Sequence, residues 1–302
     1  MTSETSLVPR LVDTALGPVQ YDLTDGEGPV VLASHAGFGG VDQARLILDW
    51  VAPDRYRLLS VSRPGYLATP LAGRETFEGQ ADLFAALLDT LGLPWVAVVT
   101  LSSGGPAGYL LAARHPDRVT ALVAISSVSG RHQQANAPGP ITRAVFTTRV
   151  GEMLTRTTAR AAPGMLVRQL LRAESRLTDQ QIREHVDHVL RTPKALDWLR
   201  SFVGTLHPYQ SRLAGTDNDT AQLVQMADLP MHDVHCPTLI VHGTHDVDVP
   251  FDHATRAHQH ITGAQHHWIE PGSHLGFWLA PTANRARSSA REFLDRHHRS
   301  RH

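Results

Sequence analysis

The sequence predicts an α/β fold in which a mostly parallel central sheet is flanked by helices on both faces. Short runs that are apolar throughout, such as residues 29–34 and 95–100, alternate along the chain with longer stretches of helical periodicity. Strands that are apolar on both faces are typical of parallel sheets buried between helices. The interval from 127 to 235 interrupts this alternation and is far longer than an ordinary crossover. It therefore indicates an inserted segment.

The expected parallel strands are short apolar runs, each close to a turn. They lie at residues 29–34, 57–62, 95–100, 119–125, 238–242 and 266–269. Helical patterns follow the first three strands, at 42–51, at 77–91 and from 103 to 115. Thr76 is the expected N-cap of the second helix, and Gly92 ends it. Residues 10–23 alternate in polarity around a glycine-proline turn and predict an antiparallel hairpin at the sheet edge.

The long interval has the composition of a folded helical segment. Its stretches with helical periodicity are 141–157, 165–172, 178–191 and 194–206. Thr178 and Gln181 form a capping box at the start of the third stretch. Pro208 and the polar residues 215–219 are expected to close the segment.

We therefore expect two domains. Residues 1–127 and 236–302 would form the core, and residues 128–235 would form a helical lid inserted into it. The alternative is a helical bundle that merely packs on the outside of the sheet.

Composition excludes several classes of protein. The chain has 28 Lys and Arg residues against 29 Asp and Glu residues, so no electrostatic footprint favours nucleic acid or an anionic membrane. Cys236 is the single cysteine, which rules out an intramolecular disulfide. The polar N-terminus argues against a secretory signal, and no apolar run approaches the roughly 18 to 20 residues that span a bilayer. We expect a cytoplasmic monomer or homodimer that binds a small molecule.

The 19 histidines raise the question of a metal site. Four of them lie close together in sequence: His232, His235, His242 and His245. However, the chain has neither the HExxH pattern nor the paired cysteines typical of zinc sites. We expect no metal and no cofactor.

The segment Thr-Leu-Ser-Ser-Gly at residues 100–104, between a strand and a helix, predicts a nucleophile. A serine hydroxyl attacks only when it is exposed and a base accepts its proton. A sharp strand-to-helix turn exposes the serine but crowds the backbone, so small residues are favoured two places away on either side. Gly104 fills the downstream place, whereas Thr100 stands where Gly-x-Ser-x-Gly has glycine. We predict Ser102 as the nucleophile; the alternative is a helix N-cap.

The segment Ser-His-Ala-Gly-Phe-Gly-Gly at residues 34–40 follows the first parallel strand and predicts an oxyanion loop. Backbone N–H groups in such a loop stabilise the negative charge that develops on a carbonyl oxygen. One donor is expected from Ser103, the residue after the nucleophile. Because glycine lets the backbone approach the substrate closely, Gly37 is the expected second donor and Phe38 the next candidate. The alternative is a plain glycine turn.

Two later loops supply an acid and a base. Asp246 lies just beyond the strand at 238–242, where a carboxylate that orients a histidine belongs. Asp248 is its rival, but it is expected to turn outward or to cap the helix that begins near Pro250. His274 follows the last strand and is the expected base.

With these residues, the chain resembles the α/β-hydrolase superfamily over nearly its full length, and within it the lidded bacterial serine esterases. The order serine, aspartate, histidine matches the family. Ser62-Arg-Pro-Gly-Tyr is similar to the family's Asp-Arg-Pro-Gly-Tyr segment, with serine in place of aspartate. The loop at 34–40 is similar to the family's His-Gly oxyanion loop, with Ala36 in place of glycine. Ser102 argues against the dehalogenase and epoxide hydrolase branches, which use aspartate.

The resemblance implies hydrolysis of a carboxylic ester or thioester through an acyl-enzyme, on a small to medium, largely apolar substrate and without a cofactor. Alternatives on the same scaffold are C–C bond hydrolysis and a biosynthetic cyclase or lyase reaction. An alternative from another class is a small-molecule receptor with slow turnover. Three side chains at helical spacing in the expected lid would line an acyl pocket or form a structural stripe: Trp198, Phe202 and Leu206.

Overall fold

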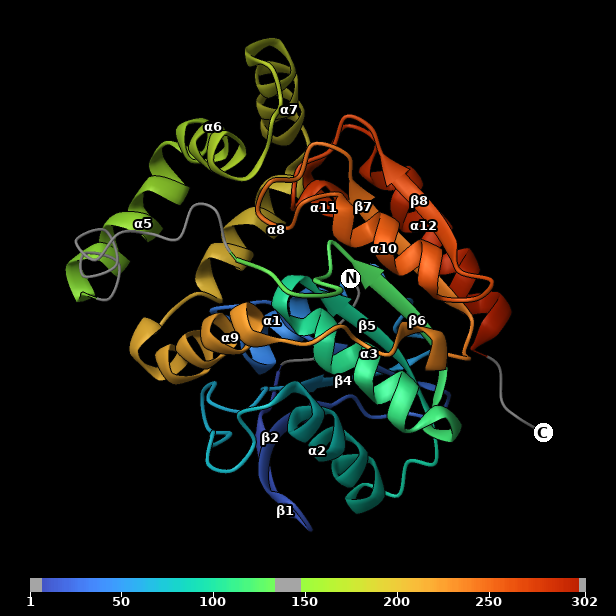
Figure 1. Cartoon of the computed structure of the whole chain (residues 1–302). Coiled ribbons are helices and arrows are strands. Elements are labelled where there is room, and N and C mark those ends of the chain that lie inside the picture. The colour runs from blue at the N-terminus through green and yellow to red at the C-terminus, as the bar shows by residue number, and fades with distance from the viewer. Residues whose placement is uncertain (1–6, 134–147, 299–302) are drawn as a thin grey trace.

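The computed structural model describes residues 7–133 and 148–298 of the chain. Within these residues, eight strands form one sheet in the order β1-β2-β4-β3-β5-β6-β7-β8 (Figure 1). In chain order the strands are β1 Arg10–Thr14, β2 Gly17–Leu23, β3 Val30–Ser34, β4 Arg57–Val61, β5 Val96–Leu101, β6 Val119–Ile125, β7 Thr238–Gly243 and β8 Gln265–Ile269. β1 and β2 form the expected hairpin, β2 pairs antiparallel with β4, and all later pairings are parallel. The predicted mostly parallel sheet is confirmed.

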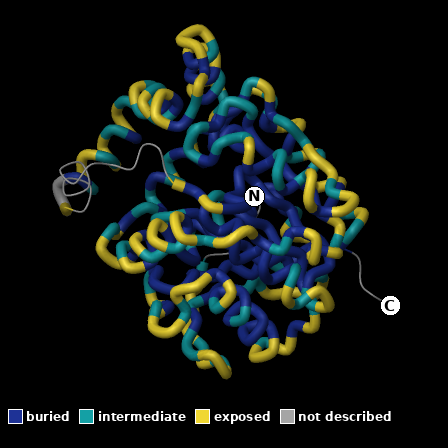
Figure 2. Tube along the Cα trace, viewed as in Figure 1, coloured by how far each residue is buried: buried dark blue, intermediate teal, exposed yellow. Residues whose placement is uncertain are grey.

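Successive residues of the central strands enter two different cores, because side chains alternate along a strand. In β3, Val31 and Ala33 belong to one core, whereas Val30 and Leu32 belong to the other. The first core lies under α1 Val41–Leu46, α11 Gly276–Leu279 and α12 Ala283–His297. The second lies under α2 Phe77–Thr90, α3 Gly105–Arg114 and α10 Asp252–His260. Figure 2 shows buried strands inside and exposed segments on the outer helices, which explains why the strands are apolar throughout.

The chain between β6 and β7 is helical. Its α-helices within the described residues are α5 Arg149–Ala161, α6 Pro163–Glu174, α7 Asp179–Arg191, α8 Pro193–Gly204 and α9 Leu213–Gln225. Figure 1 shows α5 to α8 gathered on one side of the sheet domain. The capping box expected at Thr178 and Gln181 is present. The start of the first expected helix, residues 141–147, lies outside the described residues, and the division into core and lid stays a prediction.

The expectation that residues 215–219 close the inserted segment is corrected, because they lie inside α9. Gly215 lets this helix approach the sheet domain: a Cβ there would lie 2.3 Å from the ring of Tyr66. Asp219 is buried and pairs with the buried Arg63. These polar residues form a helix because one side of it finds polar partners inside the protein. A search for apolar periodicity does not detect such a face.

Thr100 fits the crowded end of β5 because α3 offers a space opposite it. A Cβ on Gly108 would lie 2.2 Å from Thr100 Cγ2, so the missing side chain of the glycine makes room for the methyl group. The Thr100 hydroxyl lies 2.6 Å from Ser127 Oγ and is hydrogen-bonded to it. The β-branched side chain of Thr100 on β5 is therefore accommodated by Gly108 on the facing helix α3.

Gly108→Ala is expected to lower the free energy of unfolding by about 1–3 kcal/mol, the usual cost of overpacking a dense core. Adding Thr100→Ser should recover most of that loss, because serine removes the obstructing methyl group and keeps the hydroxyl. Urea denaturation of the single and double variants measures both effects. Gly204→Ala is the control, since nothing lies within 4 Å of the added Cβ. A double variant no more stable than Gly108→Ala would contradict this packing account.

Candidate active site

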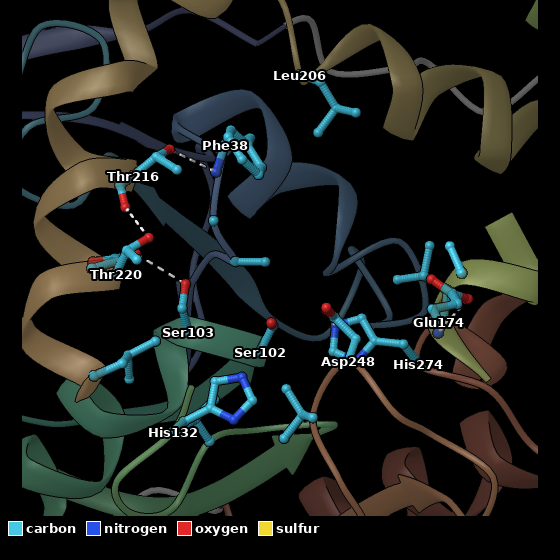
Figure 3. A pocket seen from close by; sticks show the side chains of 18 of the residues that line it. Phe38, Ser102, Ser103, His132, Glu174, Leu206, Thr216, Thr220, Asp248 and His274 are labelled. Atoms are coloured by element: carbon cyan, nitrogen blue, oxygen red, sulfur yellow. Dashed lines mark hydrogen bonds and ion pairs between the residues drawn. The ribbon is translucent and has the colours of Figure 1, made fainter. Parts of the chain in front are cut away.

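Ser102 lies at the sharp turn between β5 and α3, with φ at 53° in the left-handed region. The following glycines permit this turn. A Cβ on Gly104 would lie 2.4 Å from the carbonyl oxygen of Ser34, and one on Gly105 would lie 2.6 Å from that of Val128. The Val128 N–H also donates to the Ser102 carbonyl at 3.0 Å. Backbone contacts thus hold Ser102 in a strained conformation at the wall of a cavity (Figure 3).

Asp246 is fixed by hydrogen bonds on both of its carboxylate oxygens. Oδ1 accepts the backbone N–H groups of Asp248 and Val249, each at 2.9 Å. Oδ2 lies 2.8 Å from His274 Nδ1 and 3.3 Å from His242 Nε2. Burial alone would raise the pKa of Asp246, but the two histidines outweigh it and lower that pKa to about 2. Asp246 is therefore an ionised, immobile acceptor that orients the His274 ring.

The expectation that Asp248 turns outward or caps the next helix is corrected. Its Oδ2 lies 3.5 Å from His274 Nε2, and its side chain lines the cavity. α10 begins at Asp252 without a side-chain cap. Asp248 instead points inward. The N–H groups of Asp248 and Val249 donate to Asp246 Oδ1, and this closes the turn so that the Asp248 side chain faces the cavity.

His274 is surrounded by carboxyl groups from two parts of the chain. Asp246 and Asp248 flank its two ring nitrogens, and Glu174 approaches from the end of α6. Burial alone would lower the pKa of His274, but Asp246 and Asp248 outweigh burial and raise it to about 10. Burial raises the pKa of Glu174 to about 8, so this group is mostly neutral at pH 7. Within the described residues Ser102 Oγ makes no hydrogen bond, and His274 Nε2 faces Asp248.

One cavity of about 450 Å³ joins these groups. Ser102 and His274 both line it, and Figure 3 shows them on neighbouring walls. Of the three side chains at helical spacing, Phe202 and Leu206 line it, whereas Trp198 does not. Trp198 stacks on Trp278 with ring centroids 4.6 Å apart and belongs to the core shared by α8 and α11. Of the three side chains, one packs in the core and two line the cavity.

The candidate oxyanion donors lie together at this cavity. Gly37 and Ser103 both line it, and a Cβ on Gly37 would lie 3.7 Å from Ser103 Oγ. The Phe38 N–H donates to Thr216 Oγ1 at 3.3 Å, so it is already occupied. In the described part of the chain the Gly37 N–H has no hydrogen-bond acceptor. Ser103 lies in the first helical turn, Ser102–Gly104, before α3, where N–H groups have no acceptor within the helix.

Sequence reasoning missed a set of polar side chains beside these donors. Arg63 is fully buried and donates hydrogen bonds to Asp219, Ser103 and the carbonyl of His35. The sequence offered Arg63 only as part of a family-like segment, and it offered Asp219 as part of a polar closing loop. A buried arginine has no periodic signal of its own, so only the tertiary structure reveals the pair. Glu174 and His132 at the cavity were missed for the same reason.

Two further features concern metal sites and membrane-spanning helices. In residues 7–133 and 148–298 there is no group of three or more His, Cys, Asp or Glu side chains arranged to hold a metal ion. No helix among these residues combines the length and hydropathy needed to cross a membrane.

Comparisons with known proteins agree with the fold. Residues 29–281 match the family model described as alpha/beta hydrolase fold. The chain is 34% identical to an alpha/beta hydrolase fold protein from Nakamurella multipartita, with a TM-score of 0.87, over 95% of this chain and 99% of that one. It is 26% identical to the uncharacterized hydrolase YcgS of Bacillus subtilis over 92% and 95% of the two chains. An enol-lactonase from Burkholderia xenovorans shares the fold at 20% identity, with a TM-score of 0.64 over 95% and 100%.

Asp248→Asn is expected to lower the pKa of His274, because it removes one negative charge that stabilises the imidazolium. Titration of the His274 ring by NMR measures this shift directly. Asp197→Asn removes an exposed carboxylate on α8 and serves as the control, which should leave the His274 titration unchanged. A His274 pKa equal in Asp248→Asn and wild type would show that the Asp248 carboxylate does not act on the ring.

Proposed function

This chain belongs to the α/β-hydrolase fold family, and from that premise we propose that it is a serine hydrolase that cleaves a carboxylic ester or thioester through an acyl-enzyme. One observation carries the proposal. Ser102 and His274 line the same cavity, while Asp246 lies buried behind His274 and is bonded to its far nitrogen. This is the arrangement in which a histidine can take a proton from a serine and be stabilised as it becomes positive.

In the proposed reaction Ser102 Oγ attacks the substrate carbonyl as His274 Nε2 accepts its proton. The carbonyl oxygen becomes negative and is held by the N–H groups of Gly37 and Ser103. His274 then donates the proton to the leaving group, which departs and leaves an acyl group on Ser102. Water, deprotonated by the same nitrogen, attacks the acyl carbon. The bond to Ser102 Oγ then breaks, the acid leaves, and His274 returns the proton to Ser102 Oγ. Asp246 stays ionised throughout.

The cavity supports a small to medium, largely apolar acyl group. Its volume of about 450 Å³ lies within the usual range for small-molecule sites. Much of its wall is apolar, formed by Phe38, Val128, Leu170, Phe202, Leu206, Leu223 and Val224. Leu170, Phe202, Leu223 and Val224 come from helices between β6 and β7, and Leu206 lies just after α8, so the insertion supplies part of the proposed acyl pocket.

p-Nitrophenyl esters of two, four, eight and twelve carbons test the proposal. Wild type should release nitrophenol, with a preference for the chain lengths that the cavity holds. Ser102→Ala should lower kcat by several orders of magnitude, as loss of a triad member does. Activity that survives in Ser102→Ala would assign the reaction to another group.

A fluorophosphonate, which reacts with activated serines, separates the remaining outcomes. Labelling of Ser102 without any ester cleavage would favour C–C bond hydrolysis, a cyclase or lyase reaction, or a slow-turnover receptor. If Ser102 is not labelled, the proposal of an activated serine is wrong.

The pH dependence follows from the charges around His274. A general base must be neutral, and the pKa of His274 lies above its ordinary value of 6.5. kcat/KM should therefore fall as the pH decreases through this raised pKa, which gives an alkaline optimum. Asp248→Asn should move the same limb to lower pH. A limb that already levels off at pH 6 in wild type would contradict the raised pKa.

A further inference from the structure

Arg63 is hydrogen-bonded to one residue of the oxyanion loop, His35. Its backbone N–H donates to His35 Nε2 and its Nε donates to the His35 carbonyl, both at 3.0 Å. Because Nε2 accepts, His35 carries its proton on Nδ1 and donates it to the Ala36 carbonyl at 2.7 Å. Full burial and the neighbouring Arg63 both lower the pKa of His35, which keeps the ring neutral. Arg63 thus holds the His35 carbonyl directly and the Ala36 carbonyl through the His35 ring.

The same guanidinium is bonded to the residue after Ser102. Arg63 Nη2 donates to Ser103 Oγ at 3.1 Å, and Ser103 Oγ donates to Asp219 Oδ2 at 2.9 Å. The Ser103 side chain is therefore fixed on both sides. Its backbone N–H, the other proposed donor, belongs to the same short turn. One side chain of the core thus reaches both halves of the proposed oxyanion hole.

Asp219 balances the charge of Arg63 and orients it. The two form a bidentate pair, and the Tyr66 hydroxyl adds a 2.7 Å hydrogen bond to Asp219 Oδ2. Arg63 is 0% exposed and Asp219 3% exposed. Charges this deeply buried are tolerated only with full pairing, so the geometry of the pair is narrowly defined. Gln80 Oε1 accepts a further bond from Arg63 Nη1 and completes its surroundings.

The start of α9 and the residue before it contribute three such contacts. Arg212 directly precedes the helix, and Thr216 and Asp219 follow it after four and then three residues, so all three lie on one side of the helix. Arg212 Nη1 donates to the Gly39 carbonyl at 2.6 Å, and Thr216 accepts the N–H of Phe38. Figure 3 shows Thr216 directed at Phe38 from this helix. All three side chains therefore bind either the oxyanion loop or the turn after Ser102.

We propose that Arg63 and Asp219 are positioning residues that hold Gly37 and Ser103 at the separation needed to bind a developing oxyanion. The inserted segment, through α9, is then a structural part of the oxyanion hole as well as a wall of the cavity. This inference rests on the proposed function. Neither residue touches the reacting atoms in the proposed mechanism. They act through the His35 peptide, the Ser103 side chain and the α9 contacts.

Arg63→Lys is the main test, because lysine keeps the charge but cannot bond His35, Ser103 and Asp219 together. Removal of one oxyanion donor costs about 10²- to 10³-fold in kcat, so displacement of the donors should cost about 10- to 100-fold. KM should change less than about twofold, because ground-state binding does not use the hole. The rate at which the fluorophosphonate labels Ser102 should fall by a similar factor, since its phosphoryl oxygen occupies the same hole. A merely structural role would not produce this division between kcat and KM.

Arg114→Lys is the matched control. Arg114 lies at the end of α3, the helix that follows Ser102, and forms an exposed bidentate pair with Asp82 of α2. The substitution weakens this pair and should change neither kcat nor the labelling rate. Ser103→Ala is the second variant, because it keeps the backbone N–H and removes only the hydroxyl that Arg63 binds. It should fold, label more slowly than wild type, and add no further loss when combined with Arg63→Lys.

Three results decide the inference. A folded Arg63→Lys with the labelling rate and kcat of wild type overturns it. If Arg63→Lys does not fold, a wild-type labelling rate in Ser103→Ala overturns it instead. Absence of labelling in wild type contradicts the proposed function itself, which distinguishes that failure from a failure of this inference.

Discussion

Three stretches of backbone meet at the carboxyl edge of the parallel sheet, and their close approach governs the rest of the candidate site. Gly104 packs against the chain after β3, and Gly105 packs against the chain after β6, with no room for a side chain on either. This crowding holds Ser102 at positive φ and sets Ser103 beside Gly37. Parallel strands deliver all of these segments to one edge. The site is therefore built first from backbone packing, and its side-chain interactions are added to that framework.

The sequence was sufficient for every feature that depends on position along a strand. The buried strands are apolar throughout because helices cover both faces of the sheet. Ser102, Asp246 and His274 could be located because each follows a strand, and the structure brings all three to one edge. A residue just past a parallel strand has its place fixed by the sheet, so its neighbours can be inferred without knowledge of side-chain packing. The catalytic roles of these three residues are part of the proposed function.

The sequence was insufficient where two segments of no regular spacing meet. Arg63 and Asp219 lie far apart in the chain, and each is unremarkable until α9 folds against the sheet domain. Asp248 could not be oriented from its position, because its direction depends on hydrogen bonds within the turn after Asp246. Glu174 reaches His274 because its own carbonyl accepts the Val247 N–H, which joins the end of α6 to the same turn. Charged residues that are positioned by tertiary contacts produce no periodic pattern in the sequence.

The pairing of Thr100 with Gly108 couples the substitutions that these two positions tolerate. Thr100 departs from the small residue usual before such a serine, and its methyl group fills the space that a side chain at position 108 would need. With glycine at 100, position 108 could hold alanine, whereas with threonine at 100 an alanine at 108 would introduce strain. The residues that either position tolerates therefore depend on the residue at the other. The two positions can be varied freely only as a pair.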